Sequence, residues 1–245
     1  MIMTERNSLA TCHPSDHVAS LVAKNVDQFS FVPVVRDGKI CGLYNAERWF
    51  EEIPPADARV EGDFDALTED QVIGGEASIL EFVLSAISQP ARLVVSGGEI
   101  VGMVCLADLQ KLPVRAALFG LVTALEMVMA ERIQATCHED SGEWLGLLSP
   151  GRRRKLKEKV VSLRKSDSFV SEILATEFAD KADIIVKLSV LEGSKTKVRE
   201  QLRDIEKLRN SLAHASPFGT TRDAAEKVPH TVEAISRIIG ELRET

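Results

Sequence analysis

The 245-residue sequence has few aromatic side chains and few cysteines. Aromatic residues make up 5% of the chain and tyrosine occurs once, at Tyr44, so an extended platform for stacking nucleic-acid bases is not expected. The four cysteines are scattered and form no Cys-x-x-Cys pair, which favours free thiols over a disulfide framework or a zinc site. No signal-peptide pattern opens the chain. These absences predict a cytoplasmic protein that holds no metal.

Long apolar runs are missing as well. The longest, at residues 116–130, is interrupted by Glu126 and flanked by Arg115 and Glu131. It is too short and too charged for a membrane span, and its composition suits a buried helix. No glycine-rich segment is followed by Lys-Ser or Lys-Thr, and no nucleophile-elbow pattern occurs, which argues against P-loop NTPases and α/β-hydrolases.

Charge is unevenly distributed along the chain. The formal net charge is −7, but residues 1–112 hold 8 basic and 17 acidic side chains, whereas residues 113–245 hold 22 basic and 20 acidic ones. An acidic N-terminal part repels a polyanion, while the C-terminal part tolerates one. The asymmetry predicts two units with separate tasks.

The N-terminal part contains an internal repeat. Residues 34–44 align with residues 94–104 at an offset of 60, and both segments read as strand, tight turn and strand. The turns carry Asp-Gly at 37–38 and Gly-Gly at 97–98, which supply the positive φ angles of two-residue hairpins. We therefore predict two copies of one β-hairpin unit.

Helix-like stretches precede both hairpins. They lie at residues 16–24 and 78–88, where apolar side chains recur at three- and four-residue spacing. Residues 51–70, which are acidic and interrupted by two consecutive prolines, are interpreted as a linker between the copies. Residues 1–112 are therefore predicted to form an α+β unit.

The second half reads as an all-helical bundle, predicted for residues 113–245. Pro113 is a suitable first residue for a long amphipathic helix that ends at about residue 135. Four further helical stretches are predicted, at about residues 150–165, 168–191, 195–215 and 222–243.

The repeated unit resembles a pair of cystathionine-β-synthase (CBS) domains. The matching residues are Val32-Pro33-Val34-Val35 with Gly42 in the first copy, and residues 102–108, from Gly102 to Asp108, in the second. The resemblance implies that the two copies pack sheet to sheet and bind an adenine nucleotide in the clefts between them. It marks Pro33, Val34, Cys105, Asp108 and Arg48 as nucleotide-binding candidates.

Two of these positions depart from the family pattern. Cys105 stands where the family has a phosphate-binding hydroxyl, and a thiol is a poorer hydrogen-bond partner. In the first copy Asn45 takes the hydroxyl position and Arg48 the Asp position. Arginine cannot accept hydrogen bonds from ribose hydroxyls, although it can bind a phosphate. At most one competent cleft is expected, centred on Asp108, and the alternative is an eroded pair that only dimerises.

The C-terminal part carries an Arg-Asn…His string at Arg209, Asn210 and His214, near the end of a predicted helix. The apolar stripe of that helix includes Leu208 and Leu212. Asn210 and His214 lie one turn apart on the opposite face, whereas Arg209 falls on the edge of the stripe, where a cation needs a partner.

This string resembles the signature of HEPN domains (higher eukaryotes and prokaryotes nucleotide-binding), many of which are metal-independent ribonucleases. The supporting context is an all-helical domain over about residues 113–240, whose first helix carries Glu126 within an apolar pattern. The resemblance implies a homodimer in which two copies of the motif face one cleft. It implies no required cofactor, and no DNA specificity is expected.

These residue types suit RNA cleavage by the 2′-hydroxyl of the substrate itself. A histidine such as His214 can move a proton near neutral pH, and Arg209 can stabilise the charge that develops on the phosphate. Asn210 would orient His214 or the phosphate, and Glu126 would balance Arg209. In the non-catalytic alternative, Arg209 pairs structurally with Glu126 and His214 caps the helix end.

One basic run stands out, at Arg152, Arg153 and Arg154. It could follow an RNA backbone, although such runs are more often solvated helix faces. The sequence thus predicts an endoribonuclease of HEPN type, regulated by a nucleotide bound to the CBS pair. The alternative is a non-catalytic dimeric adaptor or regulatory protein that binds a nucleotide.

Overall fold

A computed structural model describes residues 2–137, 142–165, 171–219 and 221–244. The chain divides into two compact units, Met1–Lys111 and Leu112–Thr245. The predicted boundary followed residue 112. Each unit is described by itself.

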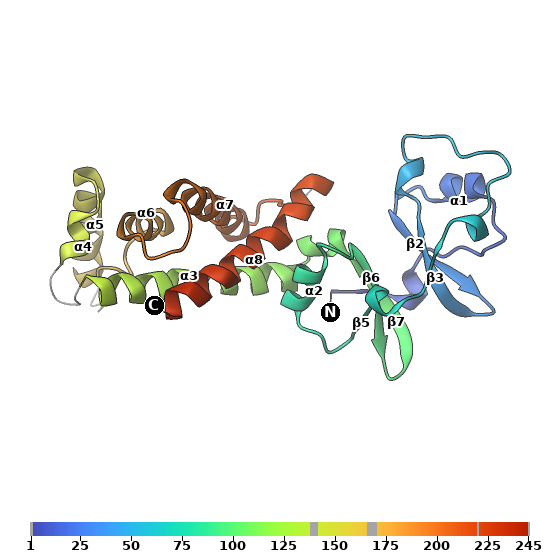
Figure 1. Cartoon of the computed structure of the whole chain (residues 1–245), viewed down its shortest axis with the longest axis horizontal. Coiled ribbons are helices and arrows are strands. Elements are labelled where there is room, and N and C mark those ends of the chain that lie inside the picture. The colour runs from blue at the N-terminus through green and yellow to red at the C-terminus, as the bar shows by residue number, and fades with distance from the viewer. Residues whose placement is uncertain (1, 138–141, 166–170, 220, 245) are drawn as a thin grey trace. The chain divides into compact units, whose positions relative to one another are not determined.

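The N-terminal unit contains two β-sheets (Figure 1). One sheet has the strand order β1-β7-β6-β5 and the other the order β2-β3-β4. The strands are β1 Thr4–Glu5, β2 Phe31–Arg36, β3 Lys39–Asn45, β4 Asp65–Ala66, β5 Val72–Gly74, β6 Ala91–Ser96 and β7 Glu99–Cys105. The buried side chains Ile40, Leu43, Leu93 and Met103 form a shared core, which joins the two sheets.

The predicted repeat is present in the backbone. β2 and β3 form one antiparallel hairpin and β6 and β7 the other, and each has a register shift at the corresponding valine pair, 34–35 in one copy and 94–95 in the other. Positive φ angles occur at both turn positions of each hairpin, residues 37–38 and 97–98. The turn residues therefore fix both hairpins, as the sequence predicted.

Two aligned glycines explain how each hairpin gains a third strand. A Cβ atom at Gly42 would overlap the carbonyl oxygen of Asp65 in β4, and one at Gly102 would overlap that of Thr4 in β1. β4 pairs with β3 beside Gly42, just as β1 pairs with β7 beside Gly102. The chain can approach this closely only where no side chain stands in the way.

Interpreting residues 51–70 as a linker is wrong for their second half. Val60 is completely buried, and residues 65–66 form β4. A capping box between Thr68 and Gln71 then orders the approach to β5. A two-residue strand has too little periodicity to be recognised in the sequence.

Both helices of this unit are shorter than predicted. α1 spans Val18–Lys24 and α2 spans Ile79–Ser85. α2 begins where the Ser78 side chain accepts a hydrogen bond from the backbone N–H of Glu81, 3.0 Å away, which is a standard N-cap.

The described parts of the C-terminal unit contain helices joined by turns and no β-strand, as predicted. Its helices are α3 Leu112–Thr136, α4 Glu143–Gly146, α5 Pro150–Lys165, α6 Phe178–Leu188, α7 Lys195–Ala213 and α8 Arg222–Glu244. α6 begins later than predicted, because Glu177 and Asp180 form a capping box there and the preceding residues make turns. The short helix α4 was not predicted.

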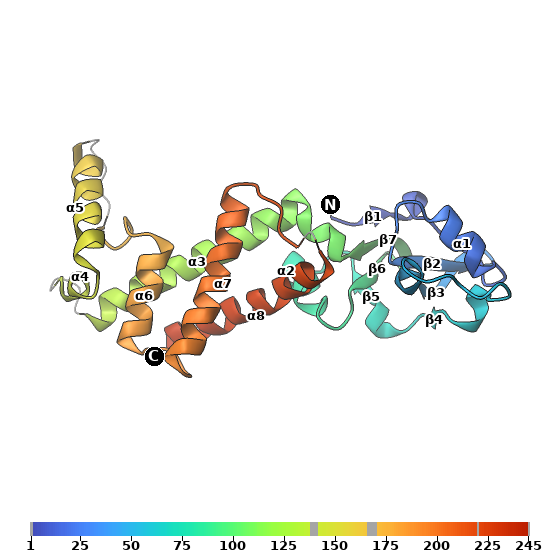
Figure 2. The same cartoon turned by 90° about the horizontal axis from the view of Figure 1, so that it is seen from above.

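Helix α3 organises this unit. It contacts α6, α7 and α8, and Figures 1 and 2 both show it running beside these helices. Among the described residues, α3 is also the one helix that is long and apolar enough to cross a membrane by length and composition alone, a test that core helices of soluble proteins also pass. The expectation that this segment is too short was wrong, because the helix continues past its apolar run to 25 residues.

Candidate functional site

Helix α7 positions the Arg-Asn…His string. The helix begins at an N-cap, where Ser194 accepts a hydrogen bond from the backbone N–H of Lys197. Its buried residues are Val198, Leu202, Ile205, Leu208 and Leu212, which form the apolar stripe that the sequence predicted. The helix ends at Ala213 with His214 as its C-cap, and Ala215 then takes a positive φ of 51°.

Arg209 forms the ion pair that the sequence predicted. Its Nε lies 3.3 Å from Oε1 of Glu126 on α3, and the two side chains are 36% and 22% exposed. Nη1 of Arg209 also donates a hydrogen bond of 3.3 Å to Oδ1 of Asn210. The guanidinium is therefore held in place, but more than a third of the side chain stays accessible.

A buried lysine, Lys181 of α6, completes this cluster. Its side chain is 2% exposed, its Nζ lies 3.9 Å from Oε2 of Glu126, and it donates a hydrogen bond of 2.8 Å to the carbonyl oxygen of Thr176. Burial lowers the pKa of Lys181, while the charge of Glu126 opposes this shift. Glu126 thus binds two cations, one buried and one half-exposed.

The sequence analysis missed Lys181. The residue lies three positions after Phe178 and four before Ile185, both buried, so it occupies an apolar-stripe position of α6. A cation at such a position needs a partner. That spacing was the available signal.

His214 and Asn210 lie on the exposed face of α7. Adjacent to them, Arg115 of α3 donates hydrogen bonds of 2.9 Å and 3.1 Å to the carbonyl oxygens of Ser211 and Ser216. Its guanidinium also lies 5.0 Å from the centre of the Phe218 ring. Arg115, which was not predicted, fixes the C-terminal end of α7 by satisfying carbonyls that the helix leaves free.

Arg209 and His214 do not converge within one chain. At about 100° per residue they are separated by roughly 140° around α7, and Arg209 is turned toward Glu126. Within a single chain Arg209 therefore hydrogen-bonds to Asn210, whereas His214, one turn after Asn210 on the exposed face, points away from Arg209.

The three arginines of the basic run have different surroundings. Arg152 contacts Asp180 at 2.6 Å and Glu177 at 2.7 Å. The hydrogen bonds that Arg152 donates to the carboxylates of Asp180 and Glu177 raise the pKa of Arg152, and the hydrogen bond from Arg152 lowers the pKa of Glu177. A phosphate would have to displace both carboxylates to reach Arg152. Arg153 is half-buried, whereas Arg154 is exposed beside Glu158 at 3.9 Å.

In the N-terminal unit, Asp108 is engaged within its own turn. It is 4% exposed, it accepts a hydrogen bond of 2.7 Å from the backbone N–H of Cys105, and it forms an ion pair of 2.7 Å with Lys111. Burial raises the pKa of the Cys105 thiol to about 11. A ribose would therefore compete with Lys111 for Asp108, and a phosphate at Cys105 would contact a neutral thiol.

The first-copy candidates lie in two different environments. Arg48 forms an ion pair with Asp63, and its guanidinium lies 4.6 Å from the centre of the Trp49 ring. Val34 is completely buried and Pro33 is buried beside it in β2. The structure therefore places Arg48 at an accessible surface and the other two in the core.

Among the residues that the structure describes, no group of three or more His, Cys, Asp or Glu side chains could hold a metal ion. Cys137 and His138 are adjacent in the sequence, but His138 lies outside the described residues.

No protein-family model matches this chain, and the search of curated proteins found no match. Solved CBS domains are similar to its N-terminal part. The CBS domain of a bacterial CNNM/CorC family Mg²⁺ transporter in complex with ATP is 21% identical, with 44% of this chain and 80% of that chain covered and a TM-score of 0.37.

Two further structures show a similar degree of likeness. A hemolysin-like protein containing a CBS domain from Oenococcus oeni is 15% identical, with 45% and 85% of the two chains covered and a TM-score of 0.36. A CBS domain protein from Streptococcus pneumoniae is 20% identical, with 45% and 82% covered and a TM-score of 0.33. The resemblance of the helical unit to HEPN domains stays a prediction.

Proposed function

We propose that this chain is a regulatory protein whose helical unit acts on RNA through Arg209, Asn210 and His214, and whose N-terminal repeats bind an adenine nucleotide. One observation carries the RNA part: Glu126 holds Arg209 at 3.3 Å while more than a third of the Arg209 side chain stays exposed. A fixed, accessible guanidinium is suited to grip a phosphate.

The activity proposed for this arrangement is metal-independent cleavage of RNA. The 2′-hydroxyl of one nucleotide attacks the neighbouring phosphorus, and the bond from phosphorus to the 5′-oxygen breaks. His214 would accept the 2′-hydroxyl proton or return one to the departing 5′-oxygen, and Arg209 would stabilise the charge on the phosphorane. The products are a 2′,3′-cyclic phosphate and a 5′-hydroxyl.

Cleavage also requires a second copy of the chain, because Arg209 and His214 point away from each other in one copy. The large apolar side chains that α3 exposes include Phe119 at 43% and Met127 at 54%. They lie two turns apart within about 80° of arc on that helix, and a second chain would remove them from water. This supports a homodimer as the active form.

A second candidate is a non-catalytic, nucleotide-binding regulatory or adaptor protein. The contacts of Arg209 favour this function. The guanidinium of Arg209 pairs with Glu126 and hydrogen-bonds to Asn210, and it does not contact His214. In this function the helical unit serves association, and the CBS-like repeats provide the ligand response. ATP is the first probe to use, because one of the similar CBS domains was solved with it.

The two candidates separate in one assay. Purified protein is incubated with single-stranded and structured RNAs in the presence of EDTA, and products are tested for a 2′,3′-cyclic phosphate. The cleavage hypothesis predicts loss of product of at least 100-fold in His214→Ala, because general acid–base catalysis contributes on the order of 10²–10⁴. The matched control is His230→Ala, which alters an exposed histidine of α8.

Two results decide against cleavage. Equal product from wild type and His214→Ala would indicate contamination, and product ends other than a cyclic phosphate would exclude attack by the 2′-hydroxyl. Calorimetry with ATP and AMP on the same protein then tests the nucleotide part. Heat that is lost in Asp108→Asn supports a ligand at the second repeat, whereas no heat with either nucleotide rules out sensing of these two.

A further inference from the structure

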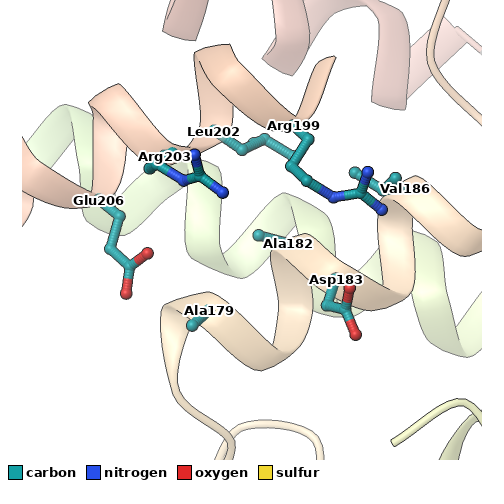
Figure 3. A pocket seen from close by; sticks show the side chains of 8 residues that line it. All are labelled: Ala179, Ala182, Asp183, Val186, Arg199, Leu202, Arg203 and Glu206. Atoms are coloured by element: carbon teal, nitrogen blue, oxygen red, sulfur yellow. The ribbon is translucent and has the colours of Figure 1, made fainter. Parts of the chain in front are cut away.

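A groove lies between α6 and α7, with a volume of about 280 Å³ (Figure 3). Small side chains of α6, Ala179 and Ala182, leave the space open. Arg199 and Arg203 line it from α7, and Figure 3 shows both guanidinium groups extending over it. The groove thus combines a narrow apolar floor with two cations from one helix.

The two arginines are available for a ligand. Both are exposed, and within the described part of the chain neither takes part in an ion pair or a side-chain hydrogen bond. Asp183 on the opposite wall forms its ion pair with Lys187, at 2.7 Å, rather than with either arginine. Glu206 is the remaining carboxylate, and in Figure 3 its oxygens point away from both guanidinium groups.

The arginines share a face with the end of the Arg-Asn…His string. At about 100° per residue, Arg199, Arg203, Asn210 and His214 fall within roughly 60° of arc around α7. From Arg199 to His214 the helix rises about 22 Å. Six or seven stacked nucleotides at about 3.4 Å each would cover that length.

We propose that the groove between α6 and α7 binds the phosphate backbone of single-stranded RNA through Arg199 and Arg203, and that the strand continues along α7 to Asn210 and His214. This inference rests on the proposed action on RNA. Guanidinium groups bind phosphate oxygens in pairs. Because the chain holds few aromatic residues, the affinity comes from backbone charge, so binding is tolerant of base sequence and strongly dependent on salt.

The test uses the full chain and a single-stranded RNA that carries 2′-O-methyl groups throughout, so that it cannot be cleaved. Fluorescence anisotropy gives the Kd over a range of salt concentrations. Arg199→Glu with Arg203→Glu weakens binding at least tenfold, and Arg199→Gln with Arg203→Gln lowers the slope of log Kd against log salt by about two, one for each lost phosphate contact. Glu206→Gln tightens binding, because it removes a negative charge from the groove.

The matched control is Lys227→Glu with Arg243→Glu, which makes the same change of net charge on exposed positions of α8. Circular dichroism and thermal unfolding confirm that each variant folds. The proposal is overturned if wild type binds no RNA, or if the groove variants and the α8 variant bind alike.

Cleavage of an ordinary RNA, followed in parallel, keeps the two hypotheses apart. Groove-dependent binding without cleavage would refute the proposed catalysis and leave the groove assignment intact. Cleavage that is undiminished in both groove variants would refute the groove assignment and leave the catalysis intact.

Discussion

Glu126 shows how a single carboxylate can organise three helices. It lies on α3, pairs with Arg209 of α7 at 3.3 Å, and lies 3.9 Å from Lys181 of α6. Lys181 is nearly inaccessible, so its charge depends on Glu126 and on the carbonyl oxygen of Thr176.

The buried lysine gives a prediction about pH. Burial lowers the pKa of Lys181 below its ordinary value of 10.5 in the folded protein. The unfolded chain therefore binds this proton more tightly, and the contribution of Lys181 to the free energy of unfolding rises as the pH increases from its folded pKa toward 10.5. Below both pKa values the lysine is charged in both states and its contribution is constant.

We expect Lys181→Met to remove this rise. Urea unfolding of wild type and variant, measured at steps from about pH 7 to about pH 10.5, gives the difference in stability at each pH. As the pH increases, the free energy of unfolding of wild type should rise relative to that of Lys181→Met. Lys187→Met, on the exposed face of the same helix, serves as the control. If the free energies of unfolding of wild type and Lys181→Met depended on pH in the same way, the lowered pKa of Lys181 would be contradicted.

Each hairpin of the N-terminal unit packs closely against a short third strand. β3 and β7 each carry a glycine where another strand crosses closely, and both glycines lie at the same place in the repeat. The two short strands, β1 and β4, come from unrelated parts of the sequence. The two copies therefore share a glycine position that leaves room for a third strand, but they do not share the sequence of that strand.

Gly102→Ala tests this feature. The added Cβ would overlap the carbonyl oxygen of Thr4, so β1 must shift away, and we expect a loss of about 1–3 kcal/mol, the typical cost of overpacking. Gly74→Ala in β5 is the control, because nothing lies within 4 Å of its added Cβ. Thermal unfolding measures both, and hydrogen exchange at β1 locates the change. Equal effects of the two substitutions would show that the close approach does not matter.

The molecule as a whole consists of two units, each with its own core. The buried cluster of the helical unit draws on residues from Val122 to Leu242, whereas the N-terminal clusters lie within residues 12–103. Their charge balances differ, as the sequence showed.

Because each unit has its own core, we expect both to fold alone. Fragments 1–111 and 112–245 should each unfold cooperatively, and calorimetry of the full chain should show two transitions near those of the fragments. A helical fragment that lacks a cooperative transition would show that its core is incomplete without the N-terminal unit.

Local patterns in the sequence determined much of this protein. The Asp-Gly and Gly-Gly turns fixed the two hairpins, and apolar periodicity fixed α5, α7 and α8 almost to the residue, because hairpin turns and helix faces are set by neighbours in the chain. The position of Arg209 at the edge of an apolar stripe indicated that it needs a partner, and the resemblance to HEPN domains suggested Glu126, with which Arg209 forms an ion pair in the structure.

Only the tertiary structure decided which charged groups are free. Arg152 and Arg199 look alike in the sequence, yet Arg152 is held by two carboxylates while Arg199 lines an open groove. Asp108 matches a ligand-binding motif but is bound to Lys111, and Lys181 is buried against Glu126. Lys111 follows Asp108 in the same turn, but the partners of Arg152 and Lys181 come from other elements that are distant in the chain. Electrostatic pairing depends on distance in space rather than on spacing in sequence.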